Sequence, residues 1–276
     1  MVTKVIQITD LHIPNQEDQR PYSDMLKQLA AHVYQEVKGL DPKTVRIVIV
    51  GDIYQNKIKA SNEARTMFHT FLNYLNQMGV KVYVIAGNHD LLENNQSRED
   101  SLRSTFVIRG AYPNIKYLDK ELGYKSGLLE DDNVIWALYS IHDMYRAPQM
   151  DGLHEKHPDK LIIGLYHGEV VGATNDSGRM FDGGIDPLSY AECDCVMAGH
   201  IHKHQEIKKN GVPLVYAGPV FQQNGGETIT RHGFLVWNLE DLSYKLHEVP
   251  NDYRILRFQI GSYDDIANDT ERLLNL

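Results

Sequence analysis

The chain has 276 residues, 42% of them hydrophobic, and carries a formal net charge of −9 at pH 7. That length and composition suit one large soluble α/β domain, and no apolar run is long enough to span a bilayer. The negative charge argues against a protein that coats nucleic acid through bulk electrostatics, although it does not exclude a nucleic-acid enzyme.

The first half of the chain alternates strand-like and helix-like segments. Three β-rich runs alternate with two segments that have apolar residues at helical spacing. The second and third runs are typical of strands that are buried on both faces. The strand-like runs are 4–10, 44–52 and 80–90, and the helix-like segments are 22–38 and 61–78. Ser61 is a suitable N-cap for the second helix. The alternation predicts a parallel sheet with right-handed crossovers.

From about Lys116 the predicted strands become shorter, and the pair Asn210-Gly211 between two of them predicts a hairpin. The chain has two cysteines, Cys193 and Cys195, which we expect to be free thiols near a buried strand. With no signal-peptide pattern at the N-terminus, we expect a cytoplasmic protein. We divide the chain into a domain over residues 1–253 and a C-terminal tail over residues 254–276.

Polar residues follow the predicted strands at the points where they end. In an open α/β sheet, ligands bind outside the carboxyl ends of the strands, so these side chains lie where they can meet. They are Asp10, His12, Asp52, Asn88, His89, Asp90, His167, His200 and His202. One such motif alone is weak, because a histidine after a strand is more often a hydrogen-bonded loop residue. Five motifs of this kind at strand ends argue for a shared site.

The donor types select a class of metal. Two Asp, one Asn and four His, without a thiolate, suit Mn, Fe, Zn or Ni better than Mg or Ca. Seven donors are too many for one four-coordinate ion, but they suit two ions about 3.5 to 4 Å apart that share a carboxylate. Asp52, after the central strand, is the natural bridge.

The ordered blocks "DLH", "GD", "GNHD", "YHGE" and "GHIH", between residues 4 and 202, resemble the signature of the calcineurin-like metallophosphoesterases. The resemblance implies an α/β fold, a four-layer α-β-β-α sandwich with two mixed sheets. It implies that one ion is held by Asp10, His12, Asp52 and His202. It implies that the other ion is held by Asp52, Asn88, His167 and His200. His89 would then face the scissile phosphate, oriented by Asp90.

Within that family the chain resembles the SbcD-type nuclease subunit of the double-strand-break repair complex. The stretches that carry this are "QITDLHIPN", "GDIY" and "PLVYAGPVFQQNGGETITRHGFLVWNLE". The resemblance implies a DNA nuclease with double-strand exonuclease and single-strand endonuclease activity. It implies that two divalent metal ions, with Mn as the expected metal, activate a hydroxide. It also implies an SbcC-type ATPase partner and a homodimer formed through about Tyr22–Gln35 and Glu63–Tyr74.

Some features depart from the nuclease pattern. Gln55 stands where that family commonly has a second histidine, and the chain stops where a capping domain would begin. The alternative is a stand-alone phosphodiesterase acting on small phosphoesters or nucleotides, and a third reading is a catalytically silent scaffold. Substrate contacts are expected at Gln55, Lys57, Lys203 and His204. Further candidate DNA contacts, for most of which a solvated surface position is the better reading, are Lys59, Arg98, Arg103, Lys208 and Lys209.

Overall fold

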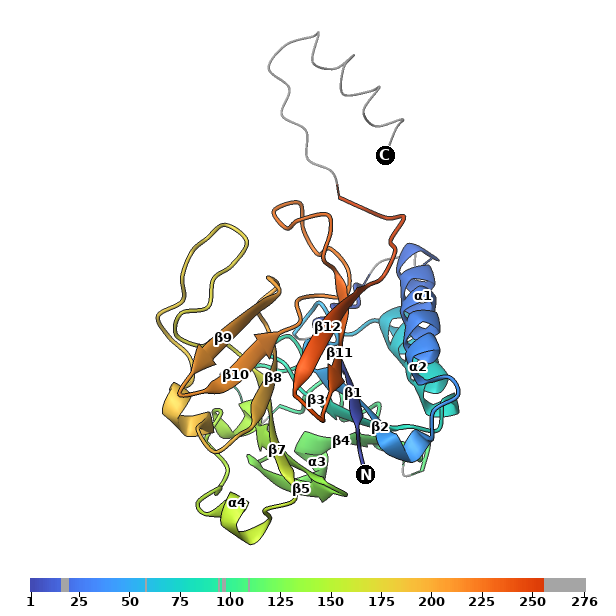
Figure 1. Ribbon diagram of the computed structural model, residues 1–276. Coiled ribbons are helices and arrows are strands. Elements are labelled where there is room, and N and C mark those ends of the chain that lie inside the picture. The colour runs from blue at the N-terminus through green and yellow to red at the C-terminus, as the bar shows by residue number, and fades with distance from the viewer. Residues whose placement is uncertain (16–19, 58, 94, 96–97, 109, 256–276) are drawn as a thin grey trace.

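The computed structural model describes residues 1–15, 20–57, 59–93, 95, 98–108 and 110–255. In these residues two six-stranded sheets pack face to face, with two long helices on the outside of the first sheet (Figure 1). The predicted tail lies outside the described residues from residue 256 onward, so the domain boundary at residue 253 stays a prediction. Among the described residues, no helix combines the length and the apolar character that crossing a membrane requires.

The first sheet has the strand order β12-β11-β1-β2-β3-β4. Its strands are β1 (Lys4–Ile8), β2 (Val45–Val50), β3 (Lys81–Ile85), β4 (Ile115–Tyr117), β11 (Gly233–Asn238) and β12 (Ser243–Glu248). Strands β1 to β4 run parallel, as the alternating sequence pattern predicts, whereas β11 and β12 add an antiparallel ribbon beside β1.

The second sheet has the order β5-β6-β7-β8-β10-β9. Its strands are β5 (Gly127–Asp131), β6 (Val134–Tyr139), β7 (Leu161–His167), β8 (Cys195–Gly199), β9 (Gln205–Lys209) and β10 (Val212–Tyr216). Strands β6, β7, β8 and β10 are parallel to one another, and β5 and β9 pair antiparallel at the two edges. Two mixed sheets in an α/β fold confirm the predicted fold class.

Three layers of apolar packing hold the sheets and helices together. The helices are α1 (Arg20–Val37), α2 (Asn62–Gln77), α3 (Leu118–Glu121) and α4 (Leu153–Lys156). Along β2, Ile47 and Ile49 pack toward α1 and α2, whereas Val48 and Val50 pack between the two sheets. This alternation explains the continuous apolar run in the sequence, because both faces of the strand are covered.

The outer face of the second sheet is covered more thinly than the first. Its cover comes from the four-residue helix α4, short 3-10 turns and loop residues such as Val170 and Ala173. Across the middle of the sandwich, β2 packs against β7 and β8 of the other sheet. As a result, the loops that follow these three strands meet at one end of the molecule.

Candidate metal centre

The loops after β1 and β2 run side by side beyond the ends of their strands. The N–H of Asp10 donates to the Gly51 carbonyl at 3.2 Å, and that of His12 donates to the Asp52 carbonyl at 2.9 Å. The φ angles of Asp10, His12 and Asp52 are 52°, 45° and 51°, positive values that residues other than glycine rarely adopt. Strained backbone of this kind clusters at functional sites, where the surrounding structure maintains it.

Two glycines of the sequence blocks are required because polar side chains lie too close to leave room for a Cβ. A Cβ on Gly87, in "GNHD", would lie 2.2 Å from Oδ1 of Asp52. A Cβ on Gly51, in "GD", would lie 2.3 Å from Nδ1 of His167, and this residue also has a φ of +80°. These glycines therefore let the loops of both sheets approach the same few polar side chains.

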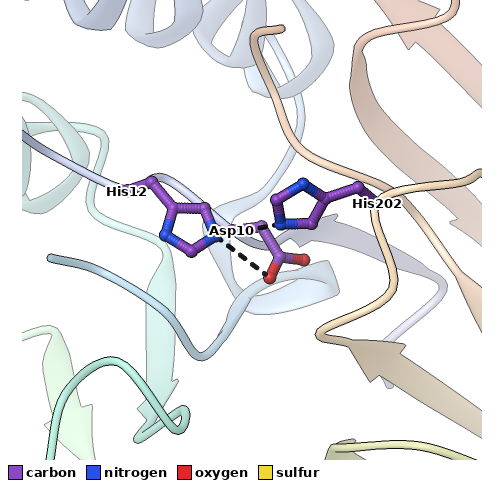
Figure 2. Close-up of side chains that lie close together, drawn as sticks. All are labelled: Asp10, His12 and His202. Carbon is purple, nitrogen blue, oxygen red and sulfur yellow. Dashed lines mark hydrogen bonds and ion pairs between the residues drawn. The ribbon is translucent and has the colours of Figure 1, made fainter. Parts of the chain in front are cut away.

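One group of polar side chains contains Asp10, His12 and His202, which point toward one another in Figure 2. Nε2 of His12 lies 3.0 Å from Nε2 of His202 and 3.9 Å from Oδ1 of Asp10. The same Nε2 lies 3.6 Å from Oδ2 of Asp52. His12 and Asp52 are 3% and 2% exposed, so these groups converge in a place largely closed to solvent.

A second group lies on the other side of Asp52. Nε2 of His167 is 3.1 Å from Oδ1 of Asp52 and 3.3 Å from Oδ1 of Asn88. Nδ1 of His200 is 2.7 Å from the same Asn88 oxygen. Asp52 therefore directs one carboxylate oxygen toward each group, which is the arrangement expected of a bridging ligand. All seven predicted ligands are brought together around Asp52, and their division between two ions stays a prediction.

Side chains and carbonyls outside these groups fix their orientation. Nδ1 of His167 lies 2.7 Å from the Val50 carbonyl oxygen, which can only accept, so this nitrogen carries the proton and Nε2 faces the centre. Oδ2 of Asp10 accepts from Oγ1 of Thr9 at 2.7 Å. Nδ1 of His202 lies 2.7 Å from Oε1 of Glu227. Outer partners of this kind are usual around metal-binding histidines.

The electrostatics of the centre favour cation binding. Burial lowers the pKa of His12 and of His200 to about 4, so both imidazoles are neutral and present lone pairs at pH 7. Burial also disfavours charge on His167, but the carboxylate of Asp52 outweighs this effect and raises the pKa of His167 to about 9. Although burial opposes ionisation of Asp52, the neighbouring His167 and His12 hold its pKa well below its usual range. The neutral His12 and His200 beside the ionised Asp52 are donors that fit a divalent transition ion, and binding of an ion would release the second proton of His167.

His89 and Asp90 are placed differently from the expectation. Nδ1 of His89 lies 2.8 Å from the carbonyl oxygen of Gln55, and its backbone N–H donates to Oδ1 of Asp52 at 2.7 Å. The buried carboxyl of Asp90 accepts instead from the backbone N–H groups of Gly87, Ile53 and Tyr54. Asp90 thus joins the two loops that carry Asp52 and His89, and the ring of His89 is oriented by a main-chain carbonyl.

The predicted substrate contacts are mostly engaged within the chain. Nζ of Lys57 lies 3.0 Å from Oε1 of Glu93, and Nζ of Lys203 donates to Oγ1 of Thr174 at 3.0 Å. Nδ1 of His204 is 2.9 Å from the Tyr216 carbonyl oxygen. The side chain of Gln55 is exposed beside the centre.

The other candidate DNA contacts divide in the same way. Arg103 is tied to Asp100 and stacks on Tyr124. The four remaining candidates, all exposed at the surface, are Lys59, Arg98, Lys208 and Lys209.

A pocket of about 330 Å³ opens beside His200 and His202. One wall comes from the hairpin around residues 172–181, and the other comes from the loop between β10 and β11. The lining carries amide, hydroxyl, carboxylate and imidazole groups together with one phenyl ring, and it consists of Asn175, Asp176, Ser177, Phe181, His200, Ile201, His202, Asn224, Gly226 and Glu227. Such a lining suits an uncharged polar organic group.

A comparison with protein-family models matches residues 3–204 to the calcineurin-like phosphoesterases, which covers most of the domain and both polar groups. The chain belongs to this family. Members of this family use divalent metals and act on phosphate esters, and the described residues include groups that could hold such ions. The five sequence blocks thus identified the family correctly.

Three curated relatives narrow the comparison. The chain is 31% identical over 255 residues to the uncharacterized protein R555 of Acanthamoeba polyphaga mimivirus, covering 90% of this chain but only 18% of that protein. It is 24% identical over 208 residues to a probable glycerophosphodiester phosphodiesterase, GpdQ, of Arcobacter nitrofigilis, covering 72% of this metallophosphoesterase and 71% of the relative. It is 25% identical over 204 residues to the uncharacterized metallophosphoesterase YhaO of Bacillus subtilis, of which it spans 47%.

Solved structures with low sequence identity share the fold. TT1561 of Thermus thermophilus superposes with a TM-score of 0.53 at 10% identity, covering 91% of this chain and 100% of that chain. GAP50 of Plasmodium, the anchor in the inner membrane complex, superposes with a TM-score of 0.52 at 14% identity, covering 99% and 94%. At such identities the likeness concerns the fold alone.

Glu227 is the residue at the centre that the sequence reasoning missed. It lies in the stretch "QQNGGE", which drew attention only as part of a family resemblance. A glutamate 25 positions after a predicted ligand, beyond two strands, has no periodic relation to it. The signal that was available is chemical, since a histidine ligand commonly needs a carboxylate or carbonyl partner.

Proposed function

We propose that this metallophosphoesterase binds two divalent ions and hydrolyses small phosphodiesters or nucleotides. The observation that carries the proposal is Asp52, which directs its two oxygens to separate imidazole groups. The pocket beside the centre and the extended likeness to a probable glycerophosphodiester phosphodiesterase support a small substrate.

In this proposal the ligands divide between two ions that share Asp52. The first ion is held by Asp10, His12, Asp52 and His202, and the second by Asp52, Asn88, His167 and His200. When bound, divalent ions supply Lewis acidity that lowers the pKa of water and neutralises charge on phosphoryl oxygens. Mn is the ion we expect to support the highest rate, because it is the metal that the resemblance implies.

His89 is proposed to handle the proton of the leaving group. Because the Gln55 carbonyl can only accept, Nδ1 of His89 carries a proton and Nε2 is the atom free to exchange one. The ring lies edge-on to His12 with 4.8 Å between the ring centroids, and so borders the first group of donors. From there the doubly protonated ring donates its Nε2 proton to the departing oxygen, and the neutral ring that remains takes up a proton from solvent. Asp90 is a positioning residue that fixes the loops of His89 and Asp52.

The substrate class is tested with three substrates in parallel. Metal-free protein is supplied with Mn²⁺ and given a bis-aryl phosphodiester, a glycerophosphodiester or linear duplex DNA, with Asp52→Asn as the inactive control. We expect Mn²⁺-dependent turnover of the small diesters by the wild type alone. Hydrolysis of DNA without hydrolysis of either small diester would overturn the small-substrate proposal, and inactivity on all three would overturn the phosphodiesterase proposal.

A second candidate is the DNA nuclease that works with an SbcC-type ATPase in DNA repair or recombination. One observation favours it: the stretch "QQNGGE", part of the resemblance to that nuclease, contacts the centre through Glu227 and His202. The occupied side chains of Lys57 and Lys203 count against it, because neither is free for a phosphate in this arrangement. Adding an SbcC-type ATPase to the DNA assay discriminates, since only the nuclease should gain activity.

We also propose the homodimer that the resemblance implies. The exposed surface between α1 and α2 forms an apolar groove lined by Ala30, Ala31, Tyr34, Tyr74 and Met78, together with Lys27 and Gln77. A second copy covering it would remove Tyr34, now 44% exposed, from water. Sedimentation of the wild type and of Tyr34→Glu tests this, and a monomeric wild type would refute it. The cytoplasmic location stays a prediction.

A further inference from the structure

We propose that Glu227 is a positioning residue that fixes His202 for metal binding, and that it acts on only one half of the centre. The inference rests on the proposed two-ion site and concerns the half made of Asp10, His12 and His202. Glu227 lies in the loop between β10 and β11 and is 8% exposed. A buried carboxylate in a loop needs partners, and its partners identify its role.

Three donors surround the Glu227 carboxylate. Oε1 lies 2.7 Å from Nδ1 of His202 and 2.6 Å from Nδ2 of Asn224. Oε2 accepts from the backbone N–H of Gln223 at 2.8 Å. The orientation of the Asn224 amide is set independently, because its Oδ1 accepts from the backbone N–H of Gly226 at 2.8 Å. Both Glu227 oxygens therefore act as acceptors.

This arrangement assigns the proton on His202. With both Glu227 oxygens accepting, Nδ1 of His202 must carry a hydrogen and donate it. Nε2 is then the nitrogen turned into the centre, where it lies 3.0 Å from Nε2 of His12. Without Glu227, the ring is free to adopt the other tautomer or to rotate, and both changes remove a lone pair from the position a cation requires.

The two halves of the centre are oriented by different means. His167 donates its Nδ1–H to the Val50 carbonyl, a neutral main-chain group that any residue at position 50 supplies. His202 instead depends on a side-chain carboxylate from a distant loop, which also adds negative charge on that side. Loss of Glu227 should therefore weaken one ion and leave the other almost unaffected.

A purely architectural role for Glu227 makes a different prediction. If Glu227 only anchors its own loop, then any change that loosens the loop should have the same effect on metal binding. Asn224→Ala provides the matched control, because it removes the side-chain contacts to Glu227 and Gly226 but leaves the His202–Glu227 contact in place. Glu227→Gln provides a second variant of nearly equal volume, which offers one acceptor oxygen where the loop requires two.

The test is calorimetric titration of the metal-free protein with Mn²⁺. For Glu227→Ala we expect one of two binding steps to weaken by about 10- to 100-fold and the other to keep its affinity. Glu227→Gln should weaken the same step by less, and Asn224→Ala should leave both steps near wild type. Nitrogen-15 spectra of the metal-free protein should give the Nδ1–H tautomer for His202 in the wild type and a mixture in Glu227→Ala.

Equal weakening of both steps, or the same loss in Asn224→Ala as in Glu227→Ala, would overturn the role given to Glu227. An unchanged Mn²⁺ affinity in Glu227→Ala would also overturn that role. In that case a wild type that binds metal would still support the proposed function. A wild type that binds no Mn²⁺ and cleaves no phosphodiester would overturn the proposed function and this inference together. The wild-type titration thus separates the two failures.

Discussion

Two buried aspartates lie near opposite ends of β2, and their surroundings differ in one respect. Asp131, 5% exposed, accepts from Arg46 at the start of the strand, from Nζ of Lys81 at 2.6 Å and from Oη of Tyr83 at 2.8 Å. Asp52, 2% exposed, follows the end of the strand, where its oxygens face imidazole nitrogens and a backbone N–H. The first carboxylate is neutralised by permanent cations of the chain, and the second is not.

The difference explains why one aspartate is structural and the other is a candidate ligand. A buried charge needs either a permanent counter-charge or a bound ion. Arg46 and Lys81 supply the counter-charge for Asp131, and together with Tyr83 they hold its pKa well below the usual range against the opposing effect of burial. Around Asp52, burial keeps His12 and His200 neutral at pH 7, so these two contribute lone pairs, whereas His167 must release its second proton when an ion binds. A divalent cation completes that arrangement.

Asp52→Asn is the most direct test of the difference between Asp52 and Asp131. We expect turnover to fall by more than the roughly 100-fold that loss of an outer partner causes, because both ions lose a shared ligand. The metal-free variant should be less stable than the wild type at neutral pH, because the lowered pKa of Asp52 and the raised pKa of His167 mean that this pair stabilises the folded state. Rates with Mn²⁺ and metal content measured by plasma mass spectrometry test this, and retention of both ions would contradict the bridging role.

His89→Ala separates chemistry from metal binding at the same end of the sheet. We expect the rate to fall by about 10² to 10⁴ because a general acid is lost, with metal stoichiometry unchanged. The measurement is a pair of titrations alongside steady-state rates. Loss of an ion in this variant would make His89 a ligand, a role that its proximity to His12 and Asp52 within 4.8 Å also permits.

Asp131→Asn is the counterpart at the other end. We expect a loss of about 3 to 5 kcal/mol in the free energy of unfolding, because Arg46 is left buried without its partner. Lys81 adds little to this figure, since its side chain is 54% exposed and solvent screens the pair. Urea unfolding of metal-free protein gives the value. Metal titration of the same variant serves as the control, and it should match the wild type.

The pairing of Asp131 also predicts a pH dependence. Since its pKa is lowered in the folded protein from an ordinary value of 3.8, its contribution to stability is fully present above that value. The contribution is lost as the pH falls below the ordinary value, because the unfolded chain then binds more protons than the folded one. Urea unfolding between about pH 3 and 6 should reveal a loss of stability on acidification that is smaller in Asp131→Asn. If the free energy of unfolding fell equally on acidification in the two proteins, Asp131 would not be the cause of the loss.

Much of the site could be predicted because it follows from strand geometry. The residues after neighbouring parallel strands converge at one edge, so Asp10 and Asp52 had to meet once β1 and β2 were recognised, whereas His167 joins them because the second sheet packs on the first. Local signals were equally direct. Ser61 accepts from the Ala64 N–H as an N-cap, and Asn210-Gly211, with φ angles of 51° and 85°, turns the hairpin between β9 and β10.

Contacts between loops could not be predicted in the same way. His89 is oriented by the Gln55 carbonyl, and every residue type has such a carbonyl, so no sequence signal marks it. Lys57 and Lys203 looked free, but Glu93 and Thr174 reach them from other loops. Loop paths depend on packing between distant segments, and a pattern of strand ends contains no information about them.

His204 gives the smallest expected effect and the finest test of the comparison. It lies only two residues beyond His202, yet its Nδ1 faces the Tyr216 carbonyl and its ring meets Tyr244 edge-on, away from the other imidazoles. Removing one such hydrogen bond in His204→Ala should cost about 1 kcal/mol of stability and leave both metal-binding steps intact. Urea unfolding and Mn²⁺ titration measure the two quantities on one sample. Weaker Mn²⁺ binding in His204→Ala would mean that closeness in sequence to His202 matters more than the direction of the ring. His204 would then count among the groups that need a cation, with Asp52, and not among the groups paired within the chain, with Asp131.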